Sequence, residues 1–161
     1  MNENLLDLQQ QAVDDLRQLL TGVTDQELKQ EPAPGKWSVC QIVAHLAEDE
    51  LTSSWRYRQM IERPGLRLAG FDQELWARLG SYQSWNTNDA FEMYRLLREA
   101  NVRMLAGLAA DQWHASGVHE ERGEMTVESL ARHMTGHDRN HLEQIRKVLH
   151  AGQQSGASGA R

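Results

Sequence analysis

The sequence has few of the residues that mark secreted, membrane or disulfide-stabilised proteins. Cys40 is its only cysteine, so an intrachain disulfide and a zinc site built on several thiolates are both excluded. The apolar residues around Cys40 favour a packing role for its thiol over a nucleophilic one. No apolar run approaches the roughly 18 residues that a membrane span requires, and the polar segment Met1–Asn4 does not resemble a secretory signal. We therefore expect a cytoplasmic protein without a membrane partner.

Positive charge is also scarce. The chain carries 17 Lys and Arg against 23 Asp and Glu, a net charge of −6, which argues against a protein that neutralises nucleic-acid phosphates. We therefore expect no nucleic-acid partner. With 161 residues, the chain has the size of one domain. The composition predicts a single domain over residues 1–151 and a flexible tail over residues 152–161, which are mostly Gly, Ser, Ala and Gln.

Proline occurs three times and never after residue 64, so long helices are permitted over most of the chain. Apolar residues recur at helical spacing, and capping residues such as Ser38, followed by Gln41, mark helix starts. These signals predict four long helices, over about residues 5–21, 38–63, 88–108 and 126–152. No strand pattern of convincing length is present. We predict an all-α, antiparallel-type four-helix bundle, with a long crossover connection between the second and third helices and a short helix around residues 72–79.

The last predicted helix carries His133, His137 and His141, four residues apart. At about 100° per residue, His141 lies near the middle of the apolar face, His137 lies somewhat to one side, and His133 lies at the edge. Two imidazoles buried in an apolar seam lose their hydration, and this costs free energy unless each ring finds a polar partner. Two rings one helical turn apart can both bind one metal ion, so a metal accounts for the pair economically. The alternative is that both are core histidines, each hydrogen-bonded to a separate neighbour.

A third ligand would come from another helix, and the second helix offers both His45 and Asp49. Periodicity places Asp49 further inward than His45, and it leaves the choice between them open. Edge position favours half-exposed packing for His133, and a solvated loop is the expected environment of His119. Gln144 follows His141 by less than one turn and either supports a ligand or borders the core.

Three segments together resemble the DinB-like family of bacterial four-helix proteins. They are Lys36-Trp37-Ser38 before a helix that contains His45, Phe71-Asp72-Gln73-Glu74-Leu75-Trp76 in the connection, and His137-Asp138-Arg139-Asn140-His141-Leu142-Glu143-Gln144-Ile145 near the end. The match spans nearly the whole chain. The resemblance implies a divalent-metal site formed by His45, His137 and His141, and Asp49 then becomes a supporting residue or an alternative ligand. For the metal it implies nickel, zinc, iron or manganese, and the residues do not choose among them.

The resemblance also implies a metal-dependent enzyme that acts on a small molecule, either a transferase that uses a low-molecular-weight thiol or a hydrolase. Three imidazoles leave coordination positions for water or substrate, as catalytic sites do. Two other hypotheses stay open at this point: a non-catalytic, stress-associated metal-binding bundle, and a purely structural bundle without a metal. Bundles of this size often form homodimers, but the sequence does not decide the oligomeric state.

Overall fold

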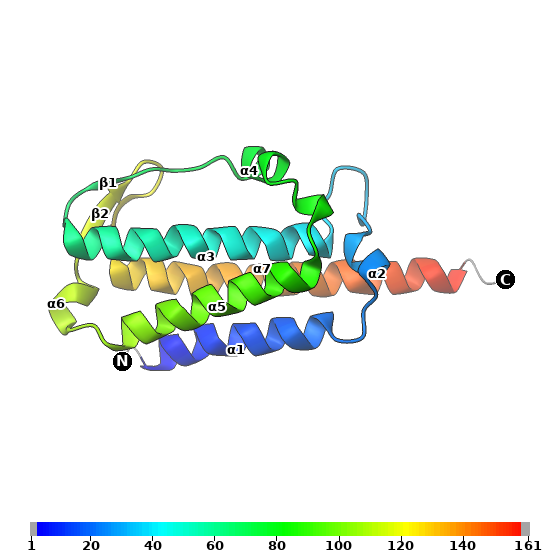
Figure 1. Ribbon diagram of the computed structural model, residues 1–161, viewed down its shortest axis with the longest axis horizontal. Coiled ribbons are helices and arrows are strands. Elements are labelled where there is room, and N and C mark those ends of the chain that lie inside the picture. Colours follow the sequence, from blue (N-terminus) through cyan, green and yellow to red (C-terminus); the bar gives the residue numbers. More distant parts are fainter. Residues whose placement is uncertain (1–2, 159–161) are drawn as a thin grey trace.

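The computed structural model describes residues 3–158 and consists mainly of four long helices (Figure 1). These are α1 (Glu3–Leu20), α3 (Val39–Glu62), α5 (Thr87–Ala106) and α7 (Val127–Ser158). The predicted all-α bundle is confirmed, and all four long helices begin within two residues of the predicted starts. None of the helices in the described part of the chain is both long and apolar enough to cross a bilayer.

Local capping explains where the helices begin. The Ser38 hydroxyl accepts a hydrogen bond from the Gln41 backbone N–H, and the Gln41 side chain accepts one from the Ser38 N–H. Asn86 caps α5 in a related way, by accepting from the backbone N–H groups of Asn88 and Asp89. Such side chains satisfy N–H groups that have no partner inside the helix.

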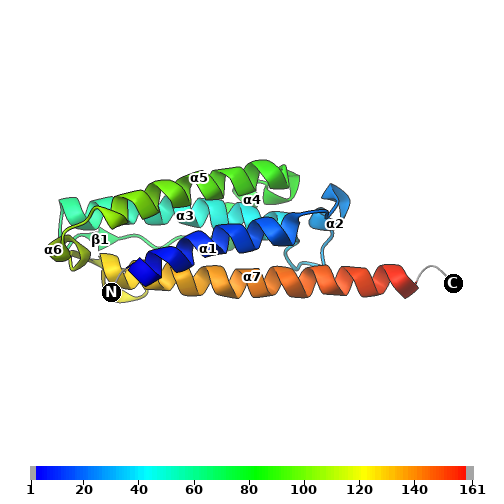
Figure 2. The same cartoon turned by 90° about the horizontal axis from the view of Figure 1, so that it is seen from below.

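Two pairs of parallel helices form the bundle. Helix α1 packs on α5 and α7, and α3 packs on the same two helices. Figures 1 and 2 show that α1 and α7 run in one direction while α3 and α5 run in the other. The predicted antiparallel arrangement therefore holds for α1 with α5 and for α3 with α7. It is wrong for the other two contacting pairs, α1 with α7 and α3 with α5, which are parallel. The cause is the crossover connection, which returns the chain along the bundle before α5 begins.

The crossover contains β1 (Arg67–Leu68), α4 (Gln73–Leu79) and a 3-10 helix (Tyr82–Ser84). The short helix predicted around residues 72–79 is thus confirmed. Strand β1 pairs in parallel with β2 (Ser116–His119), and β2 pairs antiparallel with β3 (Gly123–Thr126). The expectation of no strands was wrong, because strands of two to four residues are too short to show alternation. Gly123 closes the hairpin with a φ of 72°, which glycine adopts without strain.

Two short helices complete the fold, α2 (Asp25–Lys29) and α6 (Ala110–Trp113). The core fills the space between the four long helices, and Cys40 is buried within α3. Helix α7 continues to Ser158, past the predicted end near Gly152. The segment after Gly152 lacks proline, the residue that most strongly ends a helix. Residues 152–158 of the predicted flexible tail lie in this helix, and residues 159–161 lie outside the described residues.

Candidate metal centre

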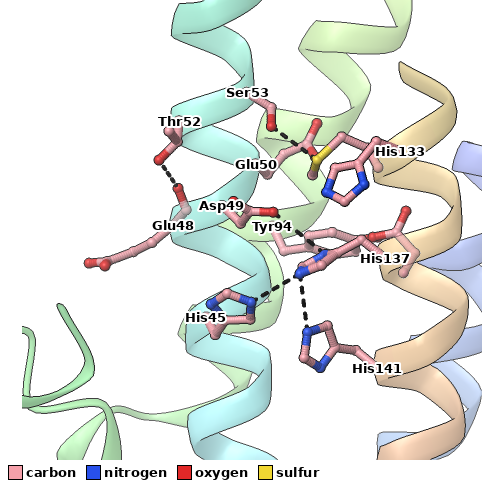
Figure 3. A network of polar contacts seen from close by, with 12 residues as sticks. His45, Glu48, Asp49, Glu50, Thr52, Ser53, Tyr94, His133, His137 and His141 are labelled. Carbon is pink, nitrogen blue, oxygen red and sulfur yellow. Dashed lines mark hydrogen bonds and ion pairs between the residues drawn. The ribbon is translucent and has the colours of Figure 1, made fainter. Parts of the chain in front are cut away.

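Helices α3 and α7 bring three histidines together in the middle of the bundle (Figure 3). The Nε2 atom of His137 lies 3.1 Å from Nε2 of His45 and 3.1 Å from Nε2 of His141. One nitrogen from each ring lies within 4.8 Å of the other two. The residues named for a metal site from the sequence are therefore neighbours in space, and we call these three residues the histidine cluster.

Burial keeps the imidazoles of the histidine cluster neutral. It lowers the pKa of His45 to about 3, with a further decrease from the nearby His141 ring. Burial also lowers the pKa of His137 to about 2, and the neighbouring histidines act in the same direction. The pKa of His141 is lowered by burial as well, although its hydrogen bond with Gln144 opposes the shift. Near neutral pH, each ring therefore presents one nitrogen lone pair.

The converging Nε2 atoms fit a metal ion better than they fit one another. A hydrogen bond between two neutral imidazoles needs a proton on one nitrogen and a lone pair on the other. The single Nε2 atom of His137 cannot serve two such bonds well. A zinc–nitrogen distance of about 2.0–2.1 Å places neighbouring ligand nitrogens about 3 Å or more apart, and the observed separations of 3.1 Å match this range. Three neutral imidazole nitrogens are also a donor set that zinc, nickel and iron accept.

The outer ring nitrogens contact two of the residues whose roles the sequence left open. Asp49 Oδ2 lies 3.5 Å from Nδ1 of His137. Within residues 3–158 that buried Nδ1 has no hydrogen-bond partner, so its contact with Asp49 is electrostatic and longer than a normal hydrogen bond. On the other ring, Gln144 Oε1 lies 2.9 Å from Nδ1 of His141. Both contacts favour a proton on Nδ1, which leaves Nε2 free to bind a metal.

Aromatic residues flank His45 on the side of the crossover. The Trp37 ring centroid lies 5.3 Å from that of His45 and 6.2 Å from that of Tyr82. Tyr82 is buried, and its hydroxyl donates a 2.5 Å hydrogen bond to Glu48. The 3-10 helix thus covers the start of α3, and His45 is only 1% exposed although it lies at the edge of the sequence-derived apolar stripe.

Beyond His137, a cavity of about 60 Å³ extends toward the β2–β3 hairpin. The residues that matter for its chemistry are Asp49, Arg56, His119, Arg122, His133 and His137. The solvated environment expected for His119 was wrong: β2 places this residue inside, where it is 5% exposed. His133 is half-buried, as its edge position predicted, and both of its ring nitrogens lie 2.9 Å from Nη1 of Arg122.

A second polar cluster was not found from the sequence. Arg98 of α5 is 1% exposed, and its guanidinium donates to Glu50 of α3 and Asp138 of α7 at 2.8 and 2.6 Å. Tyr94 and Asn101 donate to the same carboxylates, at 3.2 and 2.7 Å. Arg98 also donates to the backbone carbonyl of Gln9 in α1. We call Glu50, Arg98 and Asp138 the buried ion cluster, and with these contacts it joins all four long helices.

The fold and the histidine cluster together define a helical-bundle protein with a candidate metal centre. A family model described as the DinB superfamily matches residues 8–145, and the chain belongs to this superfamily. A protein of Oceanobacillus iheyensis, OB0413, is 26% identical over 134 residues, which cover 83% of this chain and 77% of that protein. YfiT of Bacillus subtilis is 22% identical over 134 residues, which cover 83% and 75% of the two chains. Both proteins carry the name "putative metal-dependent hydrolase".

Two solved structures share the fold. The structure of Bacillus subtilis YfiT, described as having an unusual four-helix bundle topology, superposes with a TM-score of 0.85 at 19% identity. The superposed region covers 91% of this chain and 85% of the YfiT chain. A mycothiol-dependent maleylpyruvate isomerase superposes with a TM-score of 0.74 at 10% identity, over 90% of this chain and 60% of the isomerase. At these identities, the two structures establish the bundle topology.

Proposed function

We propose that this protein is a metal-dependent enzyme that acts on a small molecule, with His45, His137 and His141 as the ligands of a divalent transition metal. The observation that carries the proposal is the convergence of three neutral imidazoles, in which Nε2 of His137 lies 3.1 Å from Nε2 of both His45 and His141. Hydrogen bonds among the rings cannot satisfy this arrangement. The names of the relatives, metal-dependent hydrolases, and of the mycothiol-dependent isomerase support the same reading.

A divalent ion bound by three imidazoles supplies Lewis acidity, which lowers the pKa of a coordinated water or thiol toward neutrality. The protein's own residues supply the orientation. Asp49 and Gln144 favour protonated Nδ1 atoms on His137 and His141, so that both rings direct a lone pair to the same point. Trp37 and Tyr82 keep water from one side of His45. Hydrolysis and thiol transfer both use such a site, and we place hydrolysis first because the sequence relatives carry that name.

The test begins with metal content. Elemental analysis of the tag-free protein should find about one equivalent of transition metal, and a His137→Ala, His141→Ala double variant should hold none while keeping its helical circular dichroism. His133→Ala is the matched control, because it removes a neighbouring histidine of the same helix and should leave the metal bound. The loaded protein is then assayed with ester and amide substrates and with low-molecular-weight thiols.

Equal metal content in the wild type and the double variant, after incubation with zinc, nickel, iron and manganese, would overturn the ligand assignment. Bound metal that depends on the histidines, with no turnover in either assay class, would favour a non-catalytic metal-binding bundle.

A further inference from the structure

The cavity beyond His137 contains two arginines without carboxylate partners. Arg56 of α3 is 8% exposed and donates one hydrogen bond, 2.7 Å, to the backbone carbonyl of Ala69 in the crossover. Arg122 of the hairpin lies against the His133 ring. Among residues 3–158, neither guanidinium forms an ion pair with Asp or Glu, whereas Arg98 binds two carboxylates. A buried guanidinium without a counter-ion, as at Arg56, is costly. The Phe71 ring, whose centroid lies 5.8 Å from Cζ of Arg56, offsets only part of this cost.

The two positive charges are close enough to act together. Burial lowers the pKa of Arg56, and the nearby charge of Arg122 lowers it further, although Asp49 and, more weakly, Glu121 oppose the shift. Arg122 and Arg56 also both lower the pKa of His133 and of His119, which line the same cavity. Like charges that repel each other across a cavity are stabilised by an anion placed between them.

The acidic residues of the cavity do not fill this role. Asp49 directs Oδ2 toward Nδ1 of His137, at 3.5 Å. Glu121 is an exposed residue of the hairpin and also lines the cavity. It forms no ion pair with either arginine and would be the group that an incoming anion repels. The N–H groups of Arg56 that do not bind Ala69 therefore remain available to a ligand, with the fork geometry that carboxylates and phosphates match.

We propose that Arg56 and Arg122 form a subsite for the anionic group, carboxylate or phosphate, of the small-molecule substrate. This inference rests on the proposed function for the identity of its ligand as a substrate. The cavity is bordered by His137, whose ring centroid lies 6.0 Å from that of His133. Because both arginines and His137 line the same cavity, a molecule held at the arginines borders the histidine cluster. Such a subsite would restrict the enzyme to substrates with an anionic group close to the reacting atoms.

The test uses the full-length, metal-free protein at constant ionic strength, titrated separately with phosphate and with succinate. The backbone amides of Gly70 and Glu121, at the rim of the cavity, are followed by NMR. We expect saturable shifts with at least one anion, and the effective anion tells whether phosphate or carboxylate is the preferred group. Arg56→Met and Arg122→Met should each weaken the binding about tenfold or more, as expected for the loss of charge-assisted hydrogen bonds.

Arg132→Met is the matched control, because Arg132 is an exposed arginine of α7 that pairs with Glu128. This variant changes the net charge by the same amount and should bind the anion as the wild type does. Glu121→Gln should tighten binding. Arg56 also donates a hydrogen bond to Ala69 of the crossover, so the folding of Arg56→Met is checked by circular dichroism. If that variant unfolds, the Arg122→Met variant decides the test, because Arg122 is exposed.

Saturable binding by neither anion, or equal binding by the wild type and both arginine variants, would overturn the subsite. Metal content is measured in the same samples after reloading. If the protein binds metal but neither anion, the anion subsite is wrong and the proposed metal site stands. If it binds an anion but no metal, the proposed function is wrong and the anion site stands.

Discussion

The histidine cluster and the buried ion cluster lie next to each other and take consecutive residues from the same two helices. On α3, Asp49 faces the histidine cluster and the next residue, Glu50, belongs to the buried ion cluster (Figure 3). On α7, His137 belongs to the histidine cluster and the next residue, Asp138, to the buried ion cluster. In the buried ion cluster, the carboxylates of Glu50 and Asp138 share the one guanidinium of Arg98. The histidine cluster instead brings nitrogen lone pairs together without enough N–H groups to donate hydrogen bonds to them. The comparison separates a cluster in which protein groups of opposite charge bind one another from a cluster of lone pairs for which we propose a metal ion.

The first way to sharpen this comparison is to break the buried ion cluster. Arg98→Met leaves Glu50 and Asp138 buried without their cation, and we expect a loss of about 3–5 kcal/mol in the free energy of unfolding. Urea denaturation at neutral pH measures it. Arg95→Met is the control, since Arg95 lies on the same helix and pairs with two carboxylates at the surface, where such pairs contribute little. A loss no larger than that of the control would show that the buried ion cluster does not stabilise the bundle.

Metal binding should affect only the histidine cluster. Zinc at about 100 times its dissociation constant should raise the free energy of unfolding of the wild type by about 2.7 kcal/mol. In a His45→Ala, His141→Ala double variant the increase should vanish, because two of the three ligands are absent. Thermal denaturation with and without zinc tests this, with His133→Ala as the variant that keeps the effect. An equal increase in the double variant would place the zinc elsewhere.

Acid should weaken the metal-free protein through the same histidines. Their pKa values in the folded protein, about 3 for His45 and about 2 for His137, lie below the ordinary value of 6.5. The unfolded chain therefore binds more protons below pH 6.5, and each residue should lower stability by about 1.4 kcal/mol per pH unit there.

Asp49 opposes part of this acid effect. Burial raises its pKa to about 6, so between about pH 6 and 4 the folded state takes up a proton that the unfolded state does not. Unfolding free energies at pH 7 and pH 5 should differ less in a His45→Gln, His137→Gln variant than in the wild type. An unchanged pH dependence would mean that these rings are not held neutral.

The smallest expected effects concern the residues behind the ligands. Asp49→Ala should weaken metal binding about tenfold, because it removes the contact that orients His137. Gln144→Ala should weaken it less, since Gln144 is exposed and water can replace its contact with His141. Competition with a chromophoric chelator compares the two. A larger effect from Gln144 would reverse the roles assigned to these residues.

The long helices could be predicted because periodicity and capping are local. The choice between His45 and Asp49 could not be made from periodicity, because α3 is covered by α5, α7 and the 3-10 helix together. Nearly every residue from Val39 to Ala47 is buried, so a helical wheel has no clear outer face there. The resemblance to the DinB-like family selected His45, and the structure places its ring beside the other two.

The buried ion cluster and the arginines of the cavity escaped prediction for another reason. Arg98 looks like any charged residue on a helix surface, and only its partners on three other helices make its burial favourable. A signal was present: Arg98 lies one turn after Tyr94 on the apolar face of its helix. Arg122 and His119 depend on a hairpin whose four-residue strands carry no recognisable pattern.

The distance along the chain between the ligating helices also bears on how the protein is made. His45 and His137 are 92 residues apart, and the second belongs to α7, which leaves the ribosome after α1, α3 and α5. A nascent chain that ends before α7 offers one histidine of the cluster, and a single imidazole holds a transition metal weakly. Domains fold as units while synthesis proceeds from the amino terminus. Under the proposed function, the ion is therefore acquired only after translation has delivered α7, so metal supply acts on chains that already contain this helix.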